Sequence, residues 1–124
     1  MNATVREWVD KAELDIPTAG RELYAPDPKN FDAVCFHAQQ CVEKLMKAFL
    51  IHSNVMPPRT HDLQRLSEML SEIHTGWSWP IEELRFLSRA AVDYRYPGES
   101  ADTWEAAEAF QIAQKLRERL LSIF

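Results

Sequence analysis

"FHAQQCVEKLMKAFLIH", residues 36–52, carries two kinds of side chain at helical spacing. An apolar stripe begins just before this stretch and contains Val34, Ala38, Cys41, Leu45 and Phe49. A polar stripe contains His37, Gln40, Lys44 and Lys47. Because successive helical residues turn by about 100°, the polar stripe lies beside the apolar one and not opposite it. The stretch therefore predicts a long core helix that starts near Asn30 as N-cap and runs to about Ser53.

The remaining sequence favours a single helical domain. The chain has 124 residues, of which 46% are hydrophobic and only three are glycine. This size is near the commonest for one domain, and the scarcity of glycine argues against an all-β fold. Amphipathic patterns predict further helices over residues 3–23, 61–74 and 79–94, and from 100–103 to about 121. We therefore expect one all-α domain over residues 1–124, an antiparallel up-and-down bundle of four to five helices.

Two features bear on where these helices begin and break. Pro17 removes a backbone donor inside the first segment, so we expect a kink near residues 13–17 or two shorter helices. Thr60 can cap the third helix, which would place His61 in its first turn. The helix N-terminus beside Arg59 can then bind an anion, or His61 can serve only in capping or packing.

Charge and cysteine content narrow the classes of function. The net charge of -5 argues against nonspecific DNA binding, which needs a basic surface. Cys35 and Cys41 point about 120° apart on one helix, so we expect small core residues in a reducing cytoplasm and no disulfide. No His or Cys spacing suits a metal ion, no motif indicates a cofactor, and no apolar run is long enough to cross a membrane. We therefore expect a cytoplasmic protein that holds neither metal nor cofactor and does not bind membranes.

Four separated segments resemble one protein family in their order and spacing. They are "WVDKAELD" (8–15), "CFHAQQCVEKLMKAFL" (35–50), "PPRTHDLQRL" (57–66) and "RAAVDYRYPG" (89–98). Along nearly its whole length the chain is similar to the HEPN domain family of small prokaryotic helical proteins. The resemblance implies a bundle of four or five helices, often a symmetric dimer, and often a partner called MNT, a minimal nucleotidyltransferase. Such pairs commonly act as toxin and antitoxin.

The resemblance also implies a site late in the bundle. Many members of the wider superfamily are metal-independent ribonucleases whose signature is an Arg followed, after four to six residues, by a His. In the subset paired with MNT the signature is Arg, four residues, His, one residue and Tyr, and this Tyr can receive adenylate from the partner. The matching stretch here is "RAAVDYRY", in which Arg89 and Tyr96 keep their positions but Tyr94 replaces His. None of the four histidines has an Arg five to seven residues before it, so the catalytic signature is absent.

The replacement of His by Tyr94 argues against RNA cleavage. Cleavage without a metal needs a general base for the 2'-hydroxyl proton, and a group with a pKa of about 7 suits this role, whereas tyrosine titrates at about 10. Two interpretations remain open. Either Arg89, Tyr94 and Tyr96 close the end of the fourth helix, or Arg89 binds phosphate on a helical face shared with Tyr96. In the second case Tyr94 is a weak catalytic candidate, and Tyr96 is an exposed candidate for modification.

The polar stripe also has two interpretations. It can be a solvated or boundary strip that flanks the core, with Glu43 and Lys47 as an i, i+4 ion pair. It can instead bind a phosphate or nucleotide in a groove between helices or subunits, because Lys supplies charge and His and Gln supply directed hydrogen bonds. The candidate ligand-binding residues are then His37, Gln40, Lys44 and Lys47, with Arg89, Tyr96 and His61 as further members.

Together these patterns predict a HEPN-like homodimer that binds nucleotide or RNA, or mediates interactions, in a toxin-antitoxin type pair with MNT. The first alternative is an active metal-independent endoribonuclease that uses Arg89, Tyr94 and Tyr96. The second alternative is a helical scaffold without a ligand.

Overall fold

The computed structural model describes residues 1–94 and 96–124, and over these residues it contains five helices and no strand. The helices are α1 (Ala3–Leu23), α2 (Phe31–His52), α3 (Leu63–Ile73), α4 (Ile81–Asp93) and α5 (Thr103–Leu121). The prediction of an all-α bundle is confirmed.

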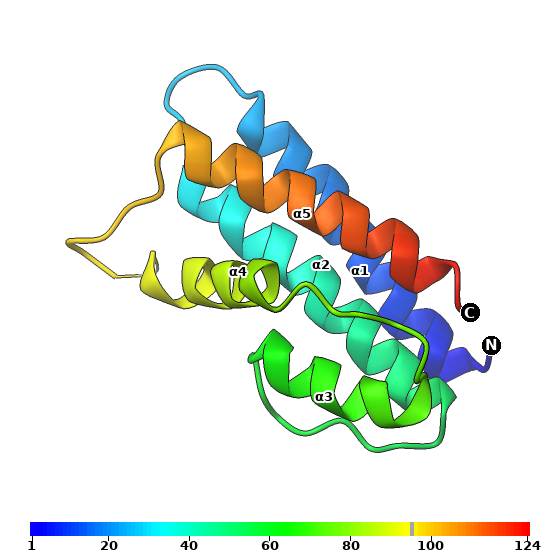
Figure 1. Ribbon diagram of the computed structural model, residues 1–124. Coiled ribbons are helices and arrows are strands. Elements are labelled where there is room, and N and C mark those ends of the chain that lie inside the picture. The colour runs from blue at the N-terminus through cyan, green and yellow to red at the C-terminus, as the bar shows by residue number, and fades with distance from the viewer. Residues whose placement is uncertain (95) are drawn as a thin grey trace.

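The second helix is the centre of the bundle. α2 packs against each of the other four helices, whereas α1 does not pack against α3 or α4 within the described chain. In Figure 1, α1 and α5 run along one side of α2, and the shorter α3 and α4 lie on its other side. Both chain termini lie at the same end of the bundle (Figure 1). Most of the hydrophobic core therefore forms around α2.

Burial along α2 follows the predicted apolar stripe. Thirteen of its 22 residues are buried, and they include all five members of that stripe. Every other helix contributes buried side chains to the same core, among them Val5, Val9, Leu66, Leu70, Leu84, Leu87, Ile112 and Leu116. Because α2 receives side chains from four neighbouring helices, truncation of its central Leu45 leaves a space that no single neighbour can fill.

Side-chain caps fix where the helices begin. Asn30 caps α2 as predicted, since its side-chain oxygen accepts the Ala33 amide at 3.1 Å. The prediction for the third helix is wrong, because Asp62 caps α3 in place of Thr60 and accepts the Gln64 amide at 3.0 Å. His61 consequently lies outside the helix and not in its first turn. A capping aspartate with an ionised side chain also suits the positive end of the helix dipole.

Pro17 does not divide the first helix. α1 runs without interruption from Ala3 to Leu23, so the prediction of two shorter helices is wrong. Pro17 has no backbone N–H, so the carbonyl four residues before it accepts no helical hydrogen bond. Pro17 is exposed, which places this carbonyl on the solvent side of the helix. The opposite side is held against α2 by buried residues on both sides of the proline, including Ala12 and Ala19. Tertiary packing therefore outweighs the local cost of the proline.

The two cysteines are buried and free. Burial raises the pKa of each thiol to about 12, so both are neutral at physiological pH and are poor nucleophiles. The prediction of small core residues is confirmed for Cys35 and Cys41. Over the residues that the structure describes, no helix is both long and apolar enough to cross a membrane.

Truncation of Leu45 should test the central position of α2. Leu45 is completely buried, so Leu45→Ala should lower the free energy of unfolding by about 2–5 kcal/mol. Leu14→Ala is the matched control, because this leucine is 67% exposed and its removal should cost under about 0.5 kcal/mol. Urea denaturation of both variants measures the difference. Equal stability of the two variants would show that the core is assigned to the wrong face.

Candidate functional site

The polar stripe of α2 meets two buried carboxylates, and the first is Asp15 on α1. One oxygen of Asp15 lies 2.8 Å from His37 Nδ1, and the other accepts a hydrogen bond from Lys44 Nζ at 2.6 Å. Asp15 is 7% exposed, so it has little access to other partners. Half of the predicted stripe therefore joins α2 to α1.

The second carboxylate is Glu43, on α2 itself. Lys47 Nζ donates to one of its oxygens at 3.0 Å, as the i, i+4 spacing predicted. The other oxygen accepts from Gln39 Nε2 at 3.0 Å and lies 2.8 Å from His61 Nδ1. The predicted ion pair therefore forms, but Glu43 and Lys47 are both buried, so this part of the stripe is not solvated.

Gln40 and Gln39 extend the hydrogen bonds around Glu43. Gln40 Nε2 donates to Gln39 Oε1 at 2.9 Å, and Gln39 Nε2 also donates to the backbone carbonyl of His61 at 3.0 Å. The segment before α3 is therefore bound to α2 through both the side chain and the backbone of His61. Gln39 was not predicted as a site residue, because this fully buried amide lies on the apolar side of the helix.

Glu43 is charged at neutral pH despite its burial. Burial alone would raise the pKa of this carboxyl, but hydrogen bonds from Gln39, His61 and Lys47 outweigh that effect and lower the pKa below 4.5. An ionised carboxylate only accepts hydrogen bonds, so Nδ1 of His61 carries the proton in this pair. The His61 side chain is 70% exposed.

The helix N-terminus beside His61 is already occupied by protein groups. The Asp62 carboxylate accepts the amides of Gln64 and Arg65, at 3.0 and 3.4 Å. Its negative charge stands where the predicted anion would bind, and His61 faces the Glu43 carboxylate. This geometry favours the capping and packing interpretation of His61 over the anion site.

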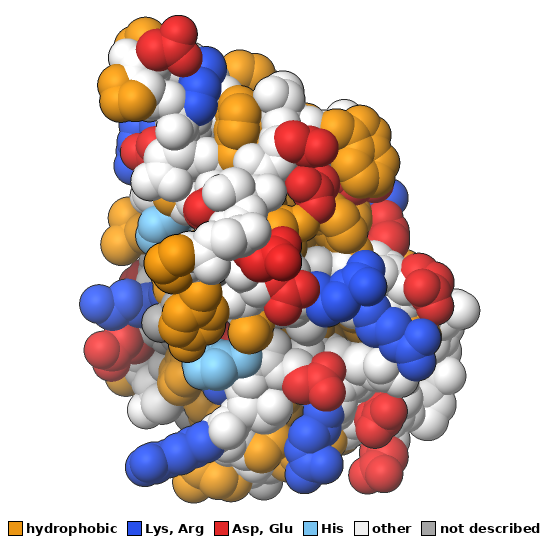
Figure 2. Space-filling view, turned by 90° about the vertical axis from the view of Figure 1, so that its left-hand side faces the viewer, with side chains coloured by type: hydrophobic (Ala, Val, Ile, Leu, Met, Phe, Trp, Pro, Cys, Tyr) orange, Lys and Arg blue, Asp and Glu red, His pale blue; other side chains and the backbone are white. Residues whose placement is uncertain are grey.

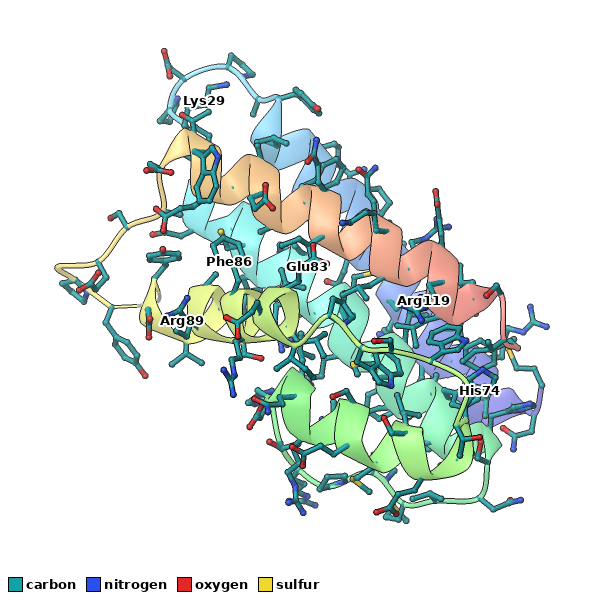
Figure 3. All side chains as sticks on the ribbon, viewed as in Figure 1. Lys29, His74, Glu83, Phe86, Arg89 and Arg119 are labelled. Atoms are coloured by element: carbon teal, nitrogen blue, oxygen red, sulfur yellow. The ribbon has the colours of Figure 1, made fainter. Side chains whose placement is uncertain are left out.

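Arg89 lies apart from both carboxylates, on α4. Figure 3 shows Arg89 and Phe86 on this helix near its connection to α5. Arg89 is exposed, and no carboxylate of the described residues lies within ion-pair distance of it. It lines a hollow of about 510 Å³ together with Arg85, Ser88 and Asp93, and a smaller one of about 260 Å³ with Phe86 and Tyr94. An exposed guanidinium without an internal partner can bind an anion from solution.

Tyr94 and Tyr96 differ in position and exposure. Tyr94 is partly buried at the C-cap of α4, and its hydroxyl donates to the carboxylate of Glu105. Burial and this hydrogen bond raise the pKa of Tyr94 above its ordinary value, which makes it a still poorer base. Tyr96 is 65% exposed, and the prediction that it is the more exposed of the two is confirmed. The prediction that Arg89 and Tyr96 share a helical face is wrong, because α4 ends at Asp93.

The predicted residues therefore fall into three places and do not form one site. His37 and Lys44 surround Asp15, whereas Gln40, Lys47 and His61 belong to the Glu43 network. Acidic and basic side chains alternate over the face shown in Figure 2, with no broad basic area. Among the described residues, no group of three or more His, Cys, Asp and Glu side chains is placed to hold a metal ion. Among the predicted site residues, Arg89 is the cation without an ion-pair partner within the described chain, since Lys44 and Lys47 are both paired with buried carboxylates.

Removal of the Glu43 charge should destabilise the fold in a pH-dependent way. Glu43→Gln leaves Lys47 buried without its carboxylate, which should cost about 3 kcal/mol at pH 7. The folded pKa of Glu43 lies below 4.5, so the wild-type contribution is full at neutral pH and is lost as the pH falls below 4.5 through the folded value. The difference between wild type and variant should therefore shrink in acid.

Urea denaturation from pH 3.5 to pH 8, on the order of one curve per half unit, measures this difference. Glu68→Gln is the control, because Glu68 is exposed on α3 and should change stability by under about 0.5 kcal/mol at every pH. A constant difference between Glu43→Gln and wild type across this range would contradict the assigned charge state.

Comparison with known proteins places this fold in a family. The sequence model of the HEPN domain family matches residues 5–123, which is nearly the whole chain. The crystal structure of TT1696 from Thermus thermophilus has a similar fold, with a TM-score of 0.79 and 23% identity over 97% of this chain and 98% of that one. The structure of ST0689, an archaeal HEPN homologue, gives a TM-score of 0.68 and 20% identity over 95% of each chain.

No curated protein sequence matched the chain. The two solved structures are related at low identity and support the fold alone. The match over residues 5–123 agrees with the resemblance carried by the four sequence segments. The chain belongs to the HEPN domain family.

Proposed function

We propose that this chain is a nucleotide- or RNA-binding HEPN protein that does not itself cleave RNA, with Arg89 as its phosphate-binding residue. The observation that supports the proposal most is the state of Arg89, which is exposed beside two hollows and has no ion-pair partner among the described side chains. Phosphate oxygens are good acceptors for a guanidinium, which can donate two parallel hydrogen bonds to them.

The position of Tyr94 supports binding in preference to cleavage. Its hydroxyl proton is committed to Glu105, and its raised pKa keeps the phenol neutral at physiological pH. The group that replaces the family's His therefore cannot take a proton from a 2'-hydroxyl at a useful rate.

The endoribonuclease alternative would need another base beside Arg89. Four carboxylates line the two hollows, and three of them already accept hydrogen bonds from described groups, namely Asp62, Glu82 and Glu105. Asp93 is then the carboxylate left for this role. The described lining of both hollows contains no histidine, the base of the family's signature.

Substitution of Arg89 tests the phosphate-binding role. Arg89→Ala should weaken binding of short single-stranded RNA or of ATP about tenfold, because a hydrogen-bonded charge is lost. The loss should also reduce the slope of log affinity against log salt concentration by about one. Fluorescence anisotropy at several salt concentrations measures both quantities. Arg65→Ala, which removes an exposed arginine of α3, is the control, and equal binding by both variants and wild type would refute the role of Arg89.

Incubation with total RNA in the presence of a chelator separates binding from cleavage. We expect intact RNA after prolonged incubation with the pure protein. Cleavage that disappears in Arg89→Ala would favour the endoribonuclease alternative. Neither cleavage nor binding of RNA or nucleotide would favour the scaffold alternative.

Family membership also supports a homodimer and an MNT partner, with Tyr96 as the acceptor of adenylate. Tyr96 is 65% exposed, as a target of an enzyme must be, whereas the hydroxyl of Tyr94 is hydrogen bonded to Glu105. With an MNT partner and ATP, mass spectrometry should detect adenylate on the wild type and on Tyr94→Phe but not on Tyr96→Phe.

Sedimentation at micromolar concentration tests the dimer, and a strict monomer would exclude any site shared between subunits.

A further inference from the structure

A groove of about 740 Å³ lies at the other end of the molecule from the α4–α5 connection. It forms where the start of α1, the end of α2 and the segment after α2 meet, near the N-terminus in Figure 1. Its apolar lining consists of Trp8, Ile51, Val55, Met56, Pro57 and Pro58. Arg89 does not line it, so the groove is separate from the proposed phosphate site.

The segment that forms one wall of the groove is fixed to the bundle at both ends. At its start, the Val55 amide donates to the Leu50 carbonyl at 2.9 Å. At its end, Nε2 of the Gln39 side chain donates to the His61 backbone carbonyl at 3.0 Å, and His61 Nδ1 lies within hydrogen-bond distance of the Glu43 carboxylate. The two prolines between these points further restrict the backbone. A preformed wall lowers the entropy that a ligand loses on binding.

The charge of the groove differs from that of the whole protein. Its charged lining residues are Lys47 and Arg59, and none of the described residues that line it is acidic. The chain as a whole carries a net charge of -5. Arg59 is exposed, and Lys47 uses one of its three N–H donors on Glu43. The groove therefore complements a negatively charged ligand.

The apolar wall restricts the kind of anion that fits. Met56 is 86% exposed, and the ring of Trp8 is only partly buried, so two large apolar side chains face solvent at the groove. A ligand that covers them gains the free energy of burying apolar surface. The uncharged polar residues of the described lining are Asn2, Thr4 and Asn54, and Asn2 already uses its side-chain oxygen to cap α1 at 2.8 Å, so an apolar chain matches the six apolar side chains better than a polar base does.

From these observations we propose that the groove binds an amphiphilic carboxylate, such as a medium-chain fatty acid. Its apolar chain covers Trp8 and Met56, and its carboxylate lies toward Arg59 and Lys47. This binding activity is independent of the phosphate site at Arg89.

Isothermal titration calorimetry with sodium decanoate, kept below its critical micelle concentration, tests the proposal. Decanoate should bind, whereas the cation decyltrimethylammonium should not, because the groove lacks acidic residues within the described chain. Hexanoate should bind at least about tenfold more weakly, since each methylene removed loses buried apolar surface. Equal binding of the anion and the cation, or no binding of decanoate, would overturn the proposal.

Two exposed side chains allow the contacts to be tested without risk to the fold. Arg59→Gln should weaken decanoate binding about fivefold through loss of a charge-assisted hydrogen bond. Met56→Gln should weaken it by a similar factor of about five through loss of apolar contact. Arg65→Gln is the matched control for charge and should bind as the wild type does. Unchanged affinity in both groove variants would place decanoate elsewhere and overturn the proposal.

Two further outcomes assign the groove to another occupant. If decanoate does not bind and Met56→Gln dissociates a dimer in sedimentation, the groove is a subunit interface. If AMP binds with dependence on Arg59 while decanoate does not, the groove is a nucleotide site. Either result contradicts the fatty acid proposal. Binding of RNA through Arg89 should be the same in Arg59→Gln as in wild type, which keeps the two sites experimentally distinct.

Discussion

The buried carboxylate of Glu43 is the interaction on which the packing of the segment before α3 depends. α2 packs against all four other helices, and its polar residues Gln39, Glu43 and Lys47 have little access to solvent. A buried charge is costly unless other polar groups satisfy it. Gln39, Gln40 and Lys47 supply three hydrogen bonds from the same helix, and a further one comes from His61, in the segment before α3. The contacts of His61 with Glu43 and with the Gln39 side chain therefore hold this segment against α2 at the buried charge.

The spacing of apolar residues was sufficient to predict α2 and its buried face, because a helix repeats its environment every three or four residues. The same spacing found the polar stripe but not its partners. Asp15 lies 22 residues before His37 and 29 before Lys44, so no local pattern connects them. The interpretation of Lys47 as solvated failed for the same reason, since its burial results from chain segments that pack over α2 from elsewhere in the sequence.

The site near Arg89 shows the same division between local pattern and tertiary structure. The family motif pointed to Arg89, which is exposed, but it did not show that α4 ends before Tyr96. The C-terminal end of α4 is bound to the start of α5. Glu105 completes the capping box of α5 with Asp102 and also accepts a hydrogen bond from the hydroxyl of Tyr94. A tyrosine in the place of the family's His thus supplies a contact between two helices. This contact supports the interpretation that Tyr94 closes the end of α4.

The Arg89 hollow and the apolar groove are separate surfaces, yet one short segment contributes to both. Arg59 lines the groove, and Asp62 lines the hollow beside Arg89 while capping α3. Between them His61 is held by Glu43, whose other oxygen binds Lys47 at the wall of the groove. Because the carboxylate is ionised and almost without solvent contact, a change in its charge alters the contacts of both Lys47 and His61. The charge of Glu43 therefore supports the geometry of both surfaces at once.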